Sequence, residues 1–232
     1  MMDESTYALV VIAHADDAEY GMAGTVARWT AEGKHIVYAV CTNGDKGTSD
    51  RNMDPMVLIV IREQEQLAAA RLLGVREVVF LRYPDQGLED TAGFRKDIVR
   101  LIRKYKPEIV AAPDPHRRYI WHRDHRIAAR VTLDAVFPFA RDHLSYPDLL
   151  EEGLEPHVVR KVWCWAPETP NYCSDITATF DIKIAALRCH KSQVGHFPSP
   201  QWEERLRQRC KQAAEGEDFE LAEAFQRVEI EW

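Results

Sequence analysis

Two short segments of the 232-residue chain combine imidazole and carboxylate side chains at spacings that could bind a metal ion: His14–Glu19 (HADDAE) and Trp121–His125 (WHRDH). Neighbouring carboxylates repel one another and resist ionisation when they are desolvated, and a bound divalent cation removes that conflict. The alternative interpretation of both segments is an ordinary helix start, where acidic residues cap free amides and interact favourably with the helix dipole.

Each of the two polar segments follows an apolar run that is short enough to be a buried strand, Tyr7–Ala13 and Glu108–Ala112. Between and after these runs the pattern alternates between further strands and amphipathic helices. The expected strands are His35–Thr42 and Glu77–Arg82, and the expected helices are Glu19–Ala31, Met56–Leu73, Phe94–Tyr105 and Asp124–Val136. This alternation predicts an α/β fold with a doubly wound parallel sheet and right-handed crossovers.

The last third of the chain is less regular. We expect strands at His157–Ala166 and Ile176–Phe180, and helices at Asp181–His190 and Trp202–Ala214. The sequence contains no internal repeat and no Gly- or Ser-rich linker. We therefore expect a single domain over residues 1–232, in which an α/β elaboration follows the parallel sheet.

The expected topology brings the two polar segments together. In a sheet with strand order 3-2-1-4-5, strands one and four are neighbours, and the loops after them diverge at a topological switch point where ligands bind. His14 and His125 would meet there, which predicts a metal site. Nitrogen and oxygen ligands without thiolate suit zinc, iron, cobalt or nickel. Two histidines, one aspartate and a position for water are typical of catalytic zinc, with Asp16 or Asp17 left over as a general base.

Composition excludes several classes of function. The chain has 30 Lys and Arg against 37 Asp and Glu, a net charge of −7, which argues against a nucleic-acid partner. It has no apolar run long enough to span a membrane and no secretory signal at its start. Its five cysteines include no C-x-x-C pair, so we expect free thiols and a cytoplasmic location. The sequence leaves the oligomeric state open, and a homo-oligomer is among the states it allows.

The two motifs also carry a family resemblance. The segment His14–Glu19, followed by Gly21 and Gly24-Thr25, resembles the A-H-P-D-D-x-E signature of the PIG-L/LmbE family, and His122–His125 resembles its H-P-D-H element. Further similar segments are Thr42–Gly47, Arg62-Glu63-x-Glu65, Asp85 before Leu88, Asp175–Thr177 and Lys191–Gln193. The resemblance implies a Rossmann-like fold and a zinc-dependent deacetylase of N-acetylglucosaminyl compounds.

The resemblance also implies a role for each matching residue. The metal ligands would be His14, Asp17 and His125, the base Asp16, the group beside the substrate carbonyl His122, its orienting partner Asp124, and the sugar-contacting residues Arg62 and Asp85. His122 would stabilise the oxyanion or protonate the leaving amine, and Tyr119 is the other candidate acid. The family's two motif prolines are replaced by Ala15 and Arg123 here. Neither position supplies a ligand, but the cation at Arg123 could reach the substrate.

Three functions are compatible with these patterns. The first is a hydrolase that removes the N-acetyl group from an N-acetylglucosamine-type sugar or its conjugate. The second is a metal-dependent amidase that acts on another N-acyl compound or on a thiol conjugate. The third is a nucleotide-binding module without chemistry, which is weakly supported because Gly21-x-x-Gly24 lacks the full G-x-G-x-x-G pattern. Measuring bound metal separates the third function from the first two.

Overall fold

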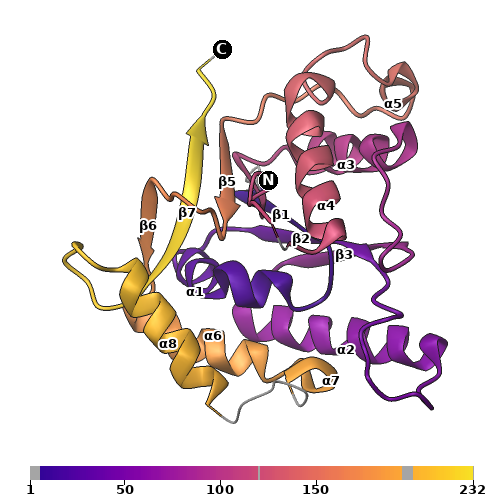
Figure 1. Ribbon diagram of the computed structural model, residues 1–232. Coiled ribbons are helices and arrows are strands. Elements are labelled where there is room, and N and C mark those ends of the chain that lie inside the picture. Colours follow the sequence, from indigo (N-terminus) through magenta and orange to yellow (C-terminus); the bar gives the residue numbers. More distant parts are fainter. Residues whose placement is uncertain (1–5, 120, 195–200, 232) are drawn as a thin grey trace.

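The computed structural model describes residues 6–119, 121–194 and 201–231. Within these residues seven strands form one sheet in the order β3-β2-β1-β4-β5-β7-β6 (Figure 1). The strands are β1 (Ala8–Ile12), β2 (Ile36–Thr42), β3 (Glu77–Tyr83), β4 (Ile109–Pro113), β5 (Lys161–Trp165), β6 (Tyr172–Asp175) and β7 (Ala222–Glu229). The first five strands are parallel, which confirms the predicted order 3-2-1-4-5.

Helices cover both faces of the sheet (Figure 1). The helices are α1 (Asp17–Ala31), α2 (Pro55–Leu73), α3 (Ala92–Tyr105), α4 (Arg123–Asp134), α5 (Pro147–Glu151), α6 (Phe180–Leu187), α7 (Lys191–Val194) and α8 (Trp202–Ala213). Buried residues of α3, α4 and α5 form one apolar cluster with the sheet, and buried residues of α1, α2 and α6 form the cluster on the opposite face. Strand β1 lies between the two clusters, and each of its five residues is completely buried.

The two central strands position the site. Strand β1 leads into α1 on one face of the sheet, whereas its neighbour β4 leads into α4 on the other face. The loops after these strands therefore diverge, which creates the crevice that doubly wound sheets use for ligands. The predicted switch point is confirmed, and both polar segments of the sequence lie at it.

Helix α1 is interrupted at Met22, whose backbone angles of φ −150° and ψ 17° are not helical. A buried ion pair compensates for this break: Glu223 of β7 accepts hydrogen bonds from the amides of Gly24 and Thr25 at 3.0 and 2.8 Å. The Nζ atom of Lys183 lies 2.6 Å from the Glu223 carboxylate. A charged pair from α6 and β7 thus satisfies amide groups that the interrupted helix leaves free.

The C-terminal third departs from the sequence-based expectations. The prediction of a strand at Ile176–Phe180 is wrong. The strand in this region, β6, ends at Asp175, a 3-10 turn covers Thr177–Thr179, and α6 begins at Phe180. Ile176 and Phe180 are buried in a third apolar cluster, with residues of α6 and α8, so their hydrophobicity reflects helix packing. Strand β7, which no expectation included, pairs antiparallel with both β5 and β6.

The helix predicted over Asp124–Val136 consists of α4 and a π-helical turn, Ala135–Phe139, that continues it. None of the helices in the described part of the chain is long and apolar enough to cross a membrane.

Candidate metal centre and active site

Three side chains from the two switch-point loops converge on one point. The Nδ1 atom of His14 lies 3.2 Å from Nε2 of His125 and 3.6 Å from Oδ2 of Asp17. The Nε2 atom of His125 lies 3.0 Å from Oδ1 of Asp17. Their side chains are between 10% and 17% exposed, so the cluster is shielded but open to small molecules. These are the three residues that the family resemblance implies as metal ligands, whereas the residue pattern alone left Asp16 and Asp17 as alternatives.

The donor set fits a zinc ion. Three donors that hold zinc tetrahedrally at about 2.0–2.1 Å lie about 3.3 Å from one another. The separations found here are close to this value, with Oδ2 of Asp17 facing His14 and Oδ1 facing His125. The cluster also attracts positive charge. Burial alone would lower the pKa of His14, but the carboxylates of Asp124, Asp17 and Asp85 raise it well above its ordinary value. The same carboxylates would attract a divalent cation, which binds histidine in its neutral form.

The backbone around β1 and α4 fixes these ligands. The amide of His14 donates a hydrogen bond to Oδ2 of Asp17 at 2.9 Å, which orients the carboxylate toward the cluster. Asp17 is the first residue of α1, and His125 lies in the first turn of α4. Because both segments are helix starts that follow buried strands, the candidate ligands are held by rigid elements.

Two further carboxylates contact the opposite edge of the His14 ring. Oδ1 of Asp85 lies 3.1 Å from Nε2 of His14, and Oδ2 of Asp124 lies 3.5 Å from the same atom. The Asp124 carboxylate also accepts the amides of Gln86 at 2.6 Å and Leu88 at 3.3 Å. A carboxylate at the distal nitrogen orients a metal-binding histidine and makes its other nitrogen a better ligand. Asp85 and Asp124 therefore both support the orientation of the His14 ring.

His122 is the N-cap of α4, and this role fixes its tautomer. Its Nδ1 atom accepts a hydrogen bond from the backbone amide of Asp124 at 3.1 Å, so in the neutral ring the proton is on Nε2. Burial and the nearby His14 and His125 lower the pKa of His122, which favours this neutral form. The sequence predicted Asp124 as the orienting partner. The structure provides that contact through the Asp124 amide, while the Asp124 carboxylate contacts His14.

Asp16 lies beside the ligands with an unusual backbone conformation. Its φ of 94° is in the left-handed region, and its side chain is 27% exposed. Burial raises the pKa of Asp16 to about 6, with Arg62 opposing that shift and the neighbouring Asp17 adding to it. A carboxyl group with such a pKa is ionised at neutral pH but is basic enough to accept a proton from water.

Arg62 and Asp85, the predicted sugar contacts, form hydrogen bonds with other groups of the protein. Arg62 is 4% exposed, and its guanidinium donates to the carbonyls of Ala15 at 2.8 Å and Gly44 at 3.3 Å. Asp85 is 3% exposed, and besides His14 it accepts the amide of Lys46 at 3.3 Å. Their contacts in the structure therefore support the loops around the metal ligands.

The remaining site predictions fall at the rim. Tyr119, the other candidate acid, is 89% exposed, and its backbone has a φ of 57°. The guanidinium of Arg123 contacts the carbonyl of Leu88 and lies 2.8 Å from the Glu89 carboxylate. Arg123, which replaces a proline of the family motif, is thus paired with the loop between β3 and α3.

A cavity of about 550 Å³ extends from the metal ligands toward α6 and α8. Its wall includes Asp16, Asp17 and His125 at one end and the buried pair Lys183 and Glu223 further along. Two pairs of an arginine and an aromatic ring also line it: the guanidinium of Arg117 stacks on Trp121, and that of Arg209 donates to the hydroxyl of Tyr20 at 2.9 Å. Neither Arg117 nor Arg209 belongs to a sequence motif, so neither could be identified as a site residue from the sequence.

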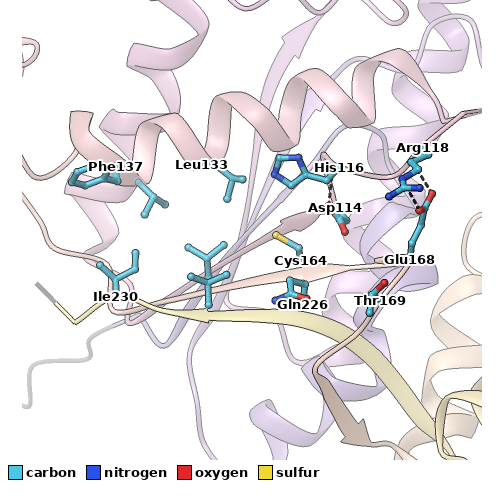
Figure 2. Close-up of a pocket in the computed structure, with 13 residues that line it drawn as sticks. Asp114, His116, Arg118, Leu133, Phe137, Cys164, Glu168, Thr169, Gln226 and Ile230 are labelled. Atoms are coloured by element: carbon cyan, nitrogen blue, oxygen red, sulfur yellow. Dashed lines mark hydrogen bonds and ion pairs between the residues drawn. The ribbon is translucent and has the colours of Figure 1, made fainter.

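A second cavity of about 560 Å³ lies on the other side of the sheet, between α4 and strands β5 and β7 (Figure 2). Its apolar end includes Leu133, Phe137 and Ile230, and its polar end includes the ion pair of Arg118 with Glu168. None of the predicted site residues lines this cavity.

Sequence reasoning missed a buried polar chain behind Asp16. The amide of Asp16 donates to Oε1 of Gln66, the Nε2 atom of Gln66 donates to Glu19, and Glu19 lies 3.3 Å from Nε2 of His190. Glu19, Gln66 and His190 are each 0% exposed. Only Glu19 had a signal in the sequence, as the last residue of the first motif.

Comparison with known proteins shows the family of this chain. Residues 9–136 match the family model described as PIG-L, GlcNAc-PI de-N-acetylase. The chain is 36% identical over 195 residues to diacetylchitobiose deacetylase from Thermococcus kodakarensis, covering 84% of this chain and 72% of that protein. It is 26% identical over 228 residues to 1D-myo-inositol 2-acetamido-2-deoxy-alpha-D-glucopyranoside deacetylase from Mycobacteroides abscessus, covering 80% and 81%.

A solved structure gives the same result. The N,N′-diacetylchitobiose deacetylase of Pyrococcus horikoshii superposes with a TM-score of 0.91 at 31% identity, covering 97% of this chain and 84% of that one. The family model covers more than half of this chain and includes both metal-site motifs. The chain belongs to the PIG-L family of deacetylases.

Proposed function

We propose that this protein is a zinc-dependent deacetylase that hydrolyses the N-acetyl group of an N-acetylglucosamine-type sugar or its conjugate and releases acetate. The observation that supports this most is the convergence of His14, Asp17 and His125, with ligand atoms 3.0–3.6 Å apart at the switch point of the sheet. These three residues would hold the metal. When bound, such an ion acts as a Lewis acid on the amide carbonyl and makes water easier to deprotonate near neutral pH.

In the proposed mechanism Asp16 is the general base. Its carboxylate lines the cavity beside Asp17 and His125, where it can accept a proton from the attacking water. With its pKa raised to about 6, the group accepts this proton more readily than an ordinary aspartate and is acidic enough, once protonated, to donate it to the leaving amine. One side chain would thereby act first as base and then as acid, and Tyr119 would not be needed.

His122 is proposed to stabilise the negative charge that develops on the carbonyl oxygen. Its Nδ1 is committed to the amide of Asp124, so its available polar atom is Nε2–H, a hydrogen-bond donor. The His122 ring lies against the His14 ring, with centroids 4.6 Å apart, which puts this donor beside the metal ligands. Between the two roles that the resemblance allowed, this tautomer favours oxyanion stabilisation over proton donation.

Asp85 and Asp124 are proposed to orient His14 rather than to act on the substrate, because both carboxylates contact its Nε2 atom. Arg62 is proposed to support the loop that carries the base. The substrate itself would occupy the cavity of about 550 Å³, which opens beside the ligands.

We further propose a reducing, cytoplasmic location. All five cysteines are free thiols. Burial raises the pKa of the Cys41 thiol well above its ordinary range and that of Cys164 to about 12, so these two thiols are unreactive.

The proposed reaction is tested by measuring acetate release from a panel of amides by the zinc-loaded protein. The panel contains N-acetylglucosamine, N,N′-diacetylchitobiose, an N-acetylglucosaminyl inositol and an N-acetylated amino acid of similar size. We expect release from at least one amino sugar and none from the amino acid. Release from the amino acid alone would show that the protein is a different amidase, and no release together with no bound zinc would contradict the proposal altogether.

A further inference from the structure

Two side chains of helix α2 form hydrogen bonds with the peptide group between Ala15 and Asp16. Oε1 of Gln66 accepts a hydrogen bond from the Asp16 amide at 3.1 Å. Arg62, four residues earlier and therefore on the same face of the helix, donates through Nη2 to the Ala15 carbonyl at 2.8 Å. The carbonyl of Ala15 and the amide of Asp16 belong to one peptide group. Both of its polar atoms are thus held by buried side chains of α2.

This peptide group sets the conformation of Asp16. Its φ of 94° lies in a region that residues other than glycine rarely occupy, so the surrounding contacts must maintain it. An aspartate at the start of a helix normally accepts hydrogen bonds from amides of the first turn. Asp16 occupies the N-cap position of α1, but its side chain makes no such bond. With this backbone the carboxylate lines the cavity instead of capping α1, and its Oδ2 lies 3.6 Å from Nη2 of Arg62.

The amide group of Gln66 can adopt only one orientation. Its Nε2 atom donates to Oε1 of Glu19 at 2.9 Å, which leaves Oε1 facing the Asp16 amide. The second oxygen of Glu19 lies 3.3 Å from Nε2 of His190. Since these side chains have no exposure to solvent, no water competes for the contacts. A fully buried polar chain thus ends on the backbone of the proposed base, and it consists of His190 between α6 and α7, Glu19 of α1 and Gln66 of α2.

We propose that Gln66 is a positioning residue for catalysis: it holds the Ala15–Asp16 peptide so that Asp16 acts as a base instead of capping α1. Glu19 and His190 support it by fixing the orientation of the Gln66 amide. This inference rests on the proposed role of Asp16. It extends that role to a residue that touches neither the metal ligands nor the cavity.

The first test replaces Gln66 by an apolar side chain of similar size. We expect Gln66→Met to lower kcat for N,N′-diacetylchitobiose about ten- to hundredfold, the cost of a small misplacement of a reacting group, with KM and zinc content unchanged. A purely structural role would lower the amount of folded protein but not the kcat of the folded fraction. The matched control is Gln226→Met, which makes the same change on β7, away from Asp16, and should leave kcat unchanged.

The second test restores the contacts with the polarity reversed. Gln66→Glu alone places two carboxylates against each other, and we expect the same loss of kcat. Adding Glu19→Gln lets position 66 still accept the Asp16 amide while the new glutamine donates to it, at the same net charge. We expect this double variant to recover most of the lost kcat. If Gln66→Met fails to fold, the double variant still tests whether Gln66 positions Asp16.

The outcomes separate this inference from the proposed function. If Asp16→Ala retains full activity, the proposed role of Asp16 is wrong. If Asp16→Ala is inactive while folded Gln66→Met keeps the kcat of the wild type, only the positioning role is wrong. Failure of the double variant to recover activity, in a folded protein with full zinc content, would likewise overturn it.

Discussion

Asp85 and His14 form a carboxylate–imidazole contact on the side of the ring that faces away from the other proposed ligands. Oδ1 of Asp85 lies 3.1 Å from Nε2 of His14, while Nδ1 of the same ring lies 3.2 Å from His125. One nitrogen is thus committed to a carboxylate and the other is free to bind a metal. This arrangement fits the proposed role of Asp85 in orienting His14, which differs from the sugar contact that the resemblance implies.

We expect Asp85→Ala to weaken zinc binding about 10- to 100-fold, the usual effect of removing such an orienting partner. Competition with a zinc chelator measures the affinity directly. Asp85→Asn, which retains an oxygen acceptor for His14 Nε2, should show a smaller effect. If Asp85→Ala instead raises KM and leaves the zinc affinity unchanged, Asp85 contacts the sugar.

Substitutions of the ligands and of the base should have different effects. His14→Ala is expected to lose the metal, because it removes one of three protein ligands. Asp16→Ala is expected to keep the metal but to lower kcat about 10²- to 10⁴-fold, the range for a positioned general base. Metal analysis of the purified variants alongside acetate release distinguishes the two. Full zinc content in His14→Ala would show that the ligand assignment is wrong.

His122 should contribute to rate without contributing to metal binding. Removing its Nε2–H donor in His122→Ala is expected to lower kcat about 10²- to 10³-fold, as for other oxyanion-stabilising donors. Because burial and its histidine neighbours lower the pKa of His122, the ring is neutral at working pH. The alkaline limb of the pH–rate profile should therefore persist in the variant. Disappearance of that limb would identify His122 as the general acid instead.

The buried pair of Lys183 and Glu223 should be important for stability. Lys183→Met leaves the carboxylate of Glu223 buried without its cation, which is expected to lower the free energy of unfolding by about 3–5 kcal/mol. Urea denaturation measures this loss. Arg188→Met, which removes an exposed partner of Glu203, is the matched control and should cost less than about 1 kcal/mol. Equal effects of the two substitutions would contradict the importance of the buried pair.

The buried contact between His190 and Glu19 should make the free energy of unfolding depend on pH. Burial would lower the pKa of His190, but its contact with Glu19 and the charges of Asp16 and Glu65 raise it. A histidine with a raised pKa stabilises the fold fully below its unfolded pKa of about 6.5, and that contribution is lost as the pH rises through the folded value. Wild type and His190→Gln should therefore differ more in unfolding free energy at about pH 6 than at about pH 9.

His157 is the matched control for that comparison. Burial lowers its pKa, so its effect on stability has the opposite sign and His157→Gln should gain relative stability at low pH. Urea titrations of both variants at the two pH values provide the measurement. A difference for His190→Gln that is constant with pH would contradict the charged contact with Glu19.

The parallel half of the fold could be predicted from sequence because its strands are continuous apolar runs between helical patterns. Strand β7 could not be predicted in this way. Its sequence includes Glu223, Gln226 and Arg227, and Glu223 is buried only because Lys183 and the interrupted helix α1 surround it. Burial of a charged residue through distant partners leaves no local pattern. At Ile176 the error was the reverse, since an apolar residue that packs between helices was interpreted as part of a strand.

The same distinction between local sequence patterns and distant contacts applies to the candidate site. His14 and His125 could be placed together because their motifs follow neighbouring strands, so topology brings them close. The choice of Asp17 over Asp16 as the third candidate ligand depends on the family resemblance. Gln66 could not be identified, since it is one polar residue on a long helix and its partner Asp16 is 50 positions away in the chain. The contacts of Arg62 and Asp85 likewise depend on how the loops fold over them.

The most direct measurement is anomalous X-ray diffraction at the zinc absorption edge from crystals of the zinc-loaded protein. The expected result is one strong peak at the switch point, bonded to Nδ1 of His14, Nε2 of His125 and the carboxylate of Asp17. A peak bonded to Nε2 of His14 together with Asp85 or Asp124, or the absence of a peak between β1 and β4, would contradict the proposed metal centre.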